Sequence, residues 1–329
     1  MARGESVIKA WNLTKTYGSF KAVDDLSFEI YTGDIFGFLE PNGAGKTTTI
    51  RMLNGLSKPS SGKATILGFD VAGQITLAKK YIGVVPELSN LYDDLSAIDN
   101  LVFMAALYGV PKAERRNRAE RLLRLFGLYE RRNSMFDTFS RGMKRALTIA
   151  AALIHEPKIV FLDEPTVGLD VVAARSLRNI IATLHSQGIT IFLTTHYLEE
   201  ADILCDRIAI LVKGRIIKTG TPKSLKDSCD SKCVVDFSFA GEISGLKKEL
   251  SIKFSGEKLE IKSPTQIRVH GIIPMKIYRA AVEFSAENNI KLESINRITP
   301  TLEDAFIKIT GLSPIILAEE ENEKQPAKR

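Results

Sequence analysis

Residues 39–50 read LEPNGAGKTTTI, and this stretch decides the fold. Its second half, GAGKT, fits the phosphate-binding loop pattern G-x-x-x-x-G-K-[ST], in which backbone N–H groups surround a phosphate at the N-terminus of a helix. An apolar run at 34–39 precedes the loop, and apolar residues at helical spacing follow it. A strand, a loop and a helix in this order predict a nucleotide site in an α/β fold.

The loop residues carry separate predictions. Gly43 and Gly45 would let the backbone approach a phosphate closely, and Lys46 would bridge the β- and γ-phosphates. The hydroxyl of Thr47 would ligate Mg²⁺. The predicted nucleotide-binding residues of this stretch are Asn42, Gly43, Ala44, Gly45, Lys46, Thr47 and Thr48.

Glu40 stands where the pattern has its first glycine. Because Pro41 follows, residue 40 is held in the extended region, where no positive φ and therefore no glycine is required. A carboxylate directed into the pocket would repel a nucleotide. We therefore expect Glu40 to point outward and to be tolerated.

A second motif, IVFLDEP at 159–165, is an apolar run that ends in two acids. Neighbouring side chains on a strand point in different directions, which gives Asp163 and Glu164 different tasks. We predict that Asp163 holds Mg²⁺ and that Glu164 polarises the attacking water. The alternative is a strand end capped by solvated acids, but the position of the pair beyond a phosphate loop favours the functional interpretation.

Two weaker signals accompany these motifs. FSRGMKRALTIAAAL at 139–153 opens a helix with Ser140 as its N-cap, and Gly142 beside it exposes further N–H groups, so a second anion site is available there. The alternative is an ordinary capped helix. His196 ends ITIFLTTH, and such a histidine is commonly structural. Its place at the carboxyl edge of a parallel sheet favours a functional role.

The whole chain alternates strands and helices up to about residue 220, which predicts a mostly parallel sheet covered on both faces. Residues 99–128 and 143–154 are predicted to be helical. Beyond 220–227 the order becomes strand, helix, strand, strand, helix, strand, helix, which is typical of a small α+β sandwich of ferredoxin type. The predicted organisation is an ATP-binding domain at 1–222 with a helical subdomain at about 90–155, an accessory domain at 223–312 and a charged, disordered tail at 313–329.

Together these motifs resemble the ATP-binding subunits of ABC transporters over residues 7–220. GAGKTT resembles Walker A, FSRGMKRAL the signature motif, IVFLDEP Walker B, TVGLD the D-loop that ends at Asp170, and TTH the switch-histidine segment. The resemblance implies a P-loop fold with an antiparallel β subdomain and a helical subdomain. It also implies that Tyr17 stacks on adenine, although an ordinary strand aromatic is the alternative.

The resemblance further implies an ATP sandwich between two copies of the chain. Residues of one copy would act with the signature residues Ser140 and Gly142 of the second copy. The residues implied on the first copy are Lys46, Thr47, Asp163, Glu164 and His196. With one copy of each motif in the chain, a symmetric pair is needed to build two sites.

The chain departs from the family pattern at a few positions. Besides Glu40, the signature reads SRGM, with Arg141 and Met143 at variant positions. Glu87 stands at the position of the Q-loop glutamine. A carboxylate there can contact Mg²⁺ or water, but it cannot donate a hydrogen bond as an amide does.

Two further stretches resemble drug- and lipid-type exporters. Residues 89–110, SNLYDDLSAIDNLVFMAALYGV, resemble the segment that receives a coupling helix of the membrane subunit. PTLEDAFIKITG at 300–311 resembles the ending of type-2 exporters such as the daunorubicin-resistance and sodium-extrusion ATPases. The alternative for this ending is a final amphipathic helix whose apolar residues are Leu302, Ala305, Phe306 and Ile309.

These features predict an ATPase that hydrolyses ATP to ADP and phosphate and drives export through a separate integral-membrane permease. No apolar run reaches the roughly 20 residues of a membrane helix, so we expect a peripheral position on the cytoplasmic face of the membrane. The net charge of +6 indicates a solvated basic surface, and no nucleic acid is expected as a partner. The alternatives are a soluble ABC ATPase that acts on nucleic acid or ribosomes and an ATP-binding regulatory subunit with degenerate chemistry.

Overall fold

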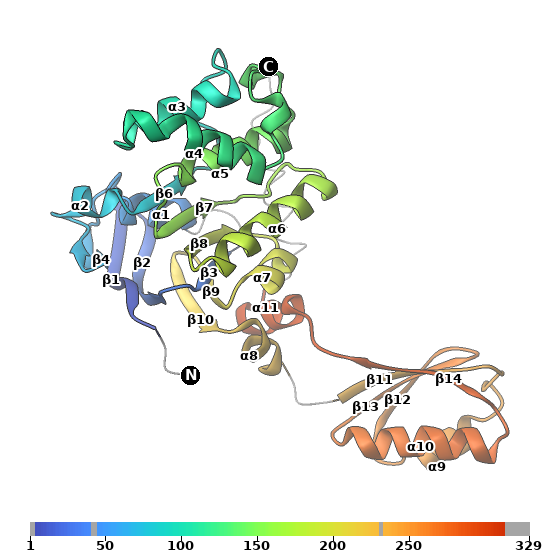
Figure 1. The fold of residues 1–329 in the computed structure, drawn as a ribbon. Helices are drawn as coiled ribbons and strands as arrows, with labels where there is room; N and C mark the ends of the chain where they lie inside the picture. The colour runs from blue at the N-terminus through green and yellow to red at the C-terminus, as the bar shows by residue number, and fades with distance from the viewer. Residues whose placement is uncertain (1–3, 41–44, 230–232, 313–329) are drawn as a thin grey trace, which may run out of the picture. The chain divides into compact units, whose positions relative to one another are not determined.

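The computed structural model describes residues 4–40, 45–229 and 233–312. These residues form two compact units (Figure 1). The first comprises the described residues up to Lys223 together with those from Ile309, and the second is Ser224–Lys308. The two units are described separately below.

A six-stranded sheet forms the centre of the first unit, in the order β10-β9-β3-β8-β7-β6. All neighbours are parallel except β10 and β9. Every residue of β3, β7 and β8 is buried, as expected for a parallel sheet covered on both faces. The strands are β3 (Ile35–Leu39), β6 (Ile82–Val85), β7 (Ile159–Asp163), β8 (Thr190–Thr195), β9 (Arg207–Val212) and β10 (Arg215–Gly220).

An antiparallel sheet of order β2-β1-β4-β5 packs against this centre. Its strands are β1 (Ser6–Tyr17), β2 (Phe20–Tyr31), β4 (Ser61–Ile66) and β5 (Phe69–Asp70). The shared core contains Phe28 from β2 and Phe38 from β3, whose ring centroids are 5.0 Å apart, with Phe192 of β8 4.7 Å from Phe38. Aromatic rings from both sheets therefore pack together in one shared core.

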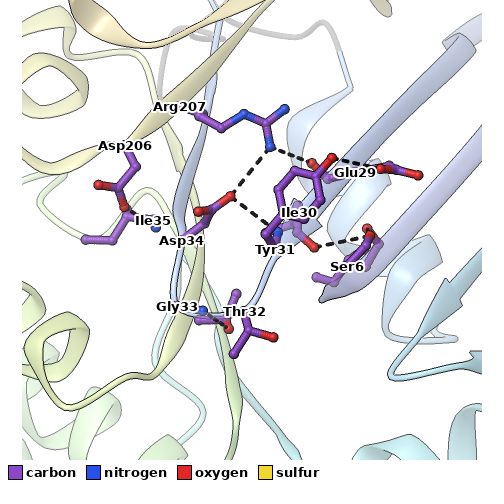
Figure 2. Close-up of polar contacts among 12 residues, drawn as sticks. Ser6, Glu29, Ile30, Tyr31, Thr32, Gly33, Asp34, Ile35, Asp206 and Arg207 are labelled. Atoms are coloured by element: carbon purple, nitrogen blue, oxygen red, sulfur yellow. Dashed lines mark hydrogen bonds and ion pairs between the residues drawn. The ribbon is translucent and has the colours of Figure 1, made fainter. Parts of the chain in front are cut away.

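Polar contacts join the two sheets at the N-terminal ends of the parallel strands (Figure 2). Arg207 donates a hydrogen bond to the carbonyl of Glu29 at 3.0 Å and lies 3.5 Å from Asp34 Oδ2. Within the central sheet, the backbone N–H of Ile35 at the start of β3 donates to Asp206 Oδ2, directly before β9, at 2.8 Å. The loops that carry the predicted site follow the opposite, C-terminal ends of the parallel strands.

The helical subdomain contains α3 (Ala97–Leu107), α4 (Lys112–Leu125) and α5 (Arg141–Leu153), which pack on one another in Figure 1. The prediction of one helical stretch over 99–128 is wrong, because the chain breaks between α3 and α4. Gly109 takes φ 76° and Pro111 caps α4, and both features stop a continuous helix. Two short 3₁₀ helices, η1 (Tyr129–Arg131) and η2 (Phe136–Thr138), lead to α5.

The remaining helices of the first part of the chain follow the loops of the sheets. They are α1 (Lys46–Leu53), α2 (Ile75–Lys79), α6 (Val171–Ser186), α7 (Leu198–Leu204) and α8 (Pro222–Asp227). Among the residues that the structure describes, no helix has both the length and the apolar character required to cross a bilayer.

The second unit has the β-α-β-β-α-β order predicted for a ferredoxin-type sandwich. Its sheet has the order β12-β13-β11-β14 with antiparallel neighbours, and α9 and α10 lie along one face of it (Figure 1). The core joins Phe237 and Phe239 of the sheet to Phe284 of α10. The elements are β11 (Cys233–Phe239), α9 (Lys247–Lys253), β12 (Lys258–Ser263), β13 (Gln266–Gly271), α10 (Pro274–Glu287) and β14 (Leu292–Ile298).

The last helix, α11 (Leu302–Thr310), buries Leu302, Ala305 and Phe306, and Ile309 is half-buried. This is the apolar face predicted for it. The predicted tail, 313–329, lies outside the described residues.

Candidate active site

The turn from β3 into α1 sets the geometry at the phosphate loop. Gly45 takes φ 109°, and a Cβ atom there would lie 2.4 Å from the carbonyl oxygen of Ala22, so only glycine fits. The first N–H groups of α1 lack intrahelical acceptors and can bind an anion. Thr47 and Thr48 are half-buried in this first turn. The predicted residues Asn42, Gly43 and Ala44 lie outside the described residues.

Glu40 does not point outward, so that prediction is wrong: the residue is 0% exposed. Its N–H donates to the carbonyl of Thr195 at 3.4 Å, which extends the pairing of β3 with β8 by one residue. The chain therefore stays inside the sheet at position 40. The carbonyl of Glu40 accepts a hydrogen bond from Lys46 Nζ at 3.1 Å, so Glu40 orients the loop lysine through its backbone.

Lys46, Glu164 and His196 meet at the carboxyl edge of the sheet. The Lys46 ammonium donates to Glu164 Oε1, and His196 Nδ1 lies 3.0 Å from Glu164 Oε2. Burial alone would raise the pKa of Glu164, but the hydrogen bond from His196 and the charge of Lys46 outweigh it and hold the pKa below its ordinary value. The Glu164 carboxylate is thus ionised and fully engaged in this arrangement.

The backbone of Glu164 is left-handed, with φ 45°. This conformation costs a residue with a Cβ about 1–2 kcal/mol, and such residues gather at functional sites. Its N–H donates to both the carbonyl and the hydroxyl oxygen of Thr194, each at 3.1 Å. Strand β7 therefore ends at Asp163, and the turn at Glu164 separates the side chains of these two acids.

Thr194 is a functional residue that the sequence reasoning missed. Its hydroxyl donates to Asp163 Oδ1 at 2.6 Å while it accepts from the N–H of Glu164, so one side chain orients both acids. The contact depends on the parallel register that places Asp163 beside Thr194. A polar residue at the end of an otherwise apolar strand was the available signal.

The donor set fits Mg²⁺. Asp163 is buried with one carboxylate oxygen held by Thr194, and Thr47 offers a hydroxyl on the facing helix turn. Within the described part of the chain, no three His, Cys, Asp or Glu side chains cluster as a cation cage. An ion held by one carboxylate, a hydroxyl, phosphate oxygens and water suits magnesium, which retains much of its hydration.

The signature residues line a different cavity, of about 490 Å³, together with Asp170. Ser140 caps α5 and accepts from the N–H of Met143 at 3.3 Å, and Asp170 caps α6 and accepts from the N–H of Ala173 at 2.8 Å. A Cβ atom on Gly142 would lie 2.8 Å from the Cβ of Ala173. Gly142 therefore permits the close approach of α5 and α6 that shapes this cavity.

The other predicted residues lie at the surface. Tyr17 ends β1 with half of its surface exposed, and Lys15 Nζ lies 5.1 Å from its ring centroid. Glu87 follows β6 with an exposed side chain, and its carbonyl accepts from Arg145 at 3.1 Å. Arg145 is the second residue that sequence reasoning missed, since its Nη2 also donates to the carbonyl of Asp163 at 2.6 Å.

The chain is similar to known proteins both in sequence and in fold. The family model described as "ABC transporter" matches residues 23–167. The Nod factor export ATP-binding protein I of Rhizobium etli is 36% identical over 307 residues, covering 91% of this chain and 92% of that protein. The daunorubicin/doxorubicin resistance ATP-binding protein DrrA of Streptomyces peucetius is 35% identical over 305 residues, covering 92% of each.

Among solved structures, a dimeric ATP-binding cassette in a post-hydrolysis state with ADP and Pi is similar to this chain. The TM-score is 0.60 at 26% sequence identity, and the match covers 65% of this chain and 98% of the cassette. The similarity is therefore to a whole cassette and to part of this chain.

Proposed function

Because the chain belongs to the ATP-binding subunits of ABC transporters, we propose that it hydrolyses ATP to ADP and phosphate in order to drive export through a separate membrane subunit. The observation that carries this proposal is the contact of Glu164 with both Lys46 and His196. These residues supply a phosphate-binding cation, a base for water and a group that orients the base.

Lys46 links nucleotide binding to the activation of Glu164. In the structure, its ammonium binds the Glu164 carboxylate and keeps the pKa of that group low, which makes Glu164 a weak base. The phosphates of ATP compete for the same ammonium. When Lys46 turns toward them, Glu164 loses a cationic partner, its pKa rises, and its carboxylate becomes available to a water molecule.

The other residues hold this arrangement in place. His196 retains its contact with Glu164 Oε2 and orients the carboxylate after Lys46 has moved. Thr194 fixes Asp163 and the turn at Glu164. When Mg²⁺ is bound, by Asp163, Thr47 and the phosphates, it neutralises charge on the phosphates.

We further propose that two copies of the chain form the working site. Ser140 and Gly142 line a cavity apart from the contacts of Lys46, and a second copy would bring them to the γ-phosphate. The dimeric cassette among the similar structures supports this arrangement. Tyr17 would stack on adenine, because its ring is exposed at the end of β1.

A membrane subunit is the proposed second partner, which would place the chain at the cytoplasmic face of the membrane. Leu88, Tyr92 and Leu107 are 82%, 53% and 65% exposed, and all lie in or beside the stretch that resembles a receiver of coupling helices. Exposed apolar side chains of this kind are typical of a docking surface. The relatives named for resistance and export favour this function over action on nucleic acid.

Phosphate release from Mg-ATP by the purified chain tests the proposal. Glu164→Gln should lower the rate by about 10²-fold or more, because a general base contributes 10²–10⁴-fold. Glu199→Gln is the matched control. Glu199 lies two residues after Tyr197, and the side chain of Glu199 is 79% exposed. Equal rates in wild type and Glu164→Gln, or failure of the wild type to bind ATP, would refute the proposal.

A further inference from the structure

Arg145 of α5 is a buried cation whose contacts are all backbone carbonyls in the described structure. The residue is 8% exposed. Nε donates to the carbonyl of Pro165 at 2.9 Å and Nη2 to that of Asp163 at 2.6 Å. Nη1 donates to the carbonyl of Glu87 at 3.1 Å and also to that of Pro86. All three nitrogens of the Arg145 guanidinium therefore donate hydrogen bonds, and the acceptors belong to two separate chain segments.

These carbonyls belong to the segments that carry the predicted chemistry. Pro86 and Glu87 directly follow β6, and Asp163 and Pro165 flank Glu164 at the end of β7. Arg145 itself lies on the helix that Ser140 caps. A single side chain thus joins the Glu87 segment, the Glu164 turn and the signature helix.

The charge of Arg145 has its own surroundings. Burial lowers its pKa to about 10, while the nearby carboxylates of Asp163, Glu87, Glu200 and Glu164 favour the charged form. It therefore remains a cation at neutral pH. The hydrogen bonds that hold this cation in the described structure all go to backbone carbonyls.

We propose that Arg145 is a positioning residue for ATP hydrolysis, which fixes the Glu87 segment and the Glu164 turn against the signature helix through its fork. This inference rests on the proposed function. Arg145 acts through the backbone of other residues and does not contact the reacting atoms.

Two substitutions remove the fork in different ways. Arg145→Lys keeps a cation but offers one nitrogen in place of a planar fork, so it cannot reach both segments in the same way. Arg145→Met keeps an unbranched apolar stem and removes the charge. Arg116→Met is the control, because Arg116 lies on the exposed face of α4 with its side chain 66% exposed.

The kinetic test measures hydrolysis of Mg-ATP by the full chain. Loss of an outer residue that orients a site typically costs 10–100-fold in activity. We expect kcat to fall by about 10-fold or more in Arg145→Lys with a much smaller change in KM, and Arg116→Met to match the wild type. A kcat in Arg145→Lys within about twofold of the wild type would overturn the positioning role.

The second test measures urea denaturation midpoints at one neutral pH and needs no turnover. Neither Arg145→Lys nor Arg145→Met can donate to both segments at once, so both variants should unfold at a lower urea concentration than the wild type. Arg116→Met should unfold at the wild-type midpoint.

The outcomes are distinguishable from those of the proposed function. A denaturation midpoint of Arg145→Lys equal to that of the wild type would show that the fork does not hold the two segments, and would overturn the proposal. If the wild type itself hydrolyses no ATP, the proposed function fails, while the denaturation midpoints still decide whether the fork of Arg145 holds the two segments.

Discussion

Glu164 holds its backbone at φ 45°, a conformation in which the Cβ atom comes close to the following carbonyl oxygen. Two hydrogen bonds from its N–H to Thr194 keep it there. The turn separates the carboxylate from Asp163 and lets Lys46 and His196 hold its two oxygens. The left-handed backbone therefore lies at the residue that we propose as the base.

This strain predicts an unusual order of stability at position 164. Glu164→Gly and Glu164→Ala lose the same carboxylate contacts, but only glycine adopts a positive φ freely. The glycine variant should be more stable by about 1 kcal/mol in urea denaturation. At Glu120, inside α4, the same pair of substitutions should have the opposite order, because glycine costs about 1 kcal/mol in a helix. An alanine variant as stable as the glycine variant at 164 would contradict the left-handed backbone.

The pKa of Glu164 predicts a pH dependence of stability. A carboxylate whose pKa is lowered by folding stabilises the protein above its ordinary pKa, and this contribution is lost as pH falls through the lower folded value. Glu164→Gln removes it. The denaturation midpoints of the wild type and this variant should differ most near neutral pH and converge in acid. A difference that is independent of pH would argue against the contacts with Lys46 and His196.

Single residues of the site differ in how far the sequence predicts them. Lys46, Asp163, Glu164 and His196 stand in recognisable motifs, and the structure places three of them in direct contact. Thr194 and Arg145 could not be predicted, because their roles depend on which strands are neighbours and on where α5 packs. Glu40 was placed wrongly, since a rule for one dipeptide does not report that the strand pairing continues past Leu39.

Helices α5 and α6 pack together where the signature residues lie, and Gly142 sets how closely the two helices approach each other. The Cβ of an added side chain would lie 2.8 Å from the Cβ of Ala173 on α6. Substitution of Gly142 would therefore disturb packing as well as any phosphate contact. Effects on activity alone cannot separate the two roles.

A double-mutant cycle measures the packing role directly. Gly142→Ala should destabilise the protein by about 1–3 kcal/mol, as overpacking does, and Ala173→Gly should restore part of the loss by removing the opposing methyl. The coupling energy between the two should be about 0.5 kcal/mol or more in chemical denaturation. Additive effects would mean that the two helices do not touch through these residues.

The elements themselves follow closely from patterns in the chain. Apolar runs predict the buried strands β3, β7 and β8. The break between α3 and α4 shows the limit of helical spacing, because apolar periodicity continues across Gly109 while its backbone does not. The positions of Gly109 and Pro111 indicate the break between the two helices, whereas the spacing of the apolar residues does not.

The molecule as a whole combines a cassette with a second unit of ferredoxin type. The order of strands and helices in the second unit could be predicted from sequence, and for the first unit only the alternation of strands with helices. In the proposed assembly, the signature cavity of one chain meets the Lys46 site of a second chain, and each chain carries both surfaces. The proposed function at this level therefore depends on two copies of the chain.

Complementation between two inactive variants tests this account most directly. Glu164→Gln disables the base, and Ser140→Arg blocks the signature surface, so each variant alone should hydrolyse ATP poorly. In a mixed dimer, one site combines the intact base of one chain with the intact signature of the other. An equal mixture should therefore recover up to about a quarter of wild-type activity, since about half of the dimers are mixed and each has one intact site. Activity no greater than the mean of the two variants, with an active wild type, would contradict a site shared between two copies.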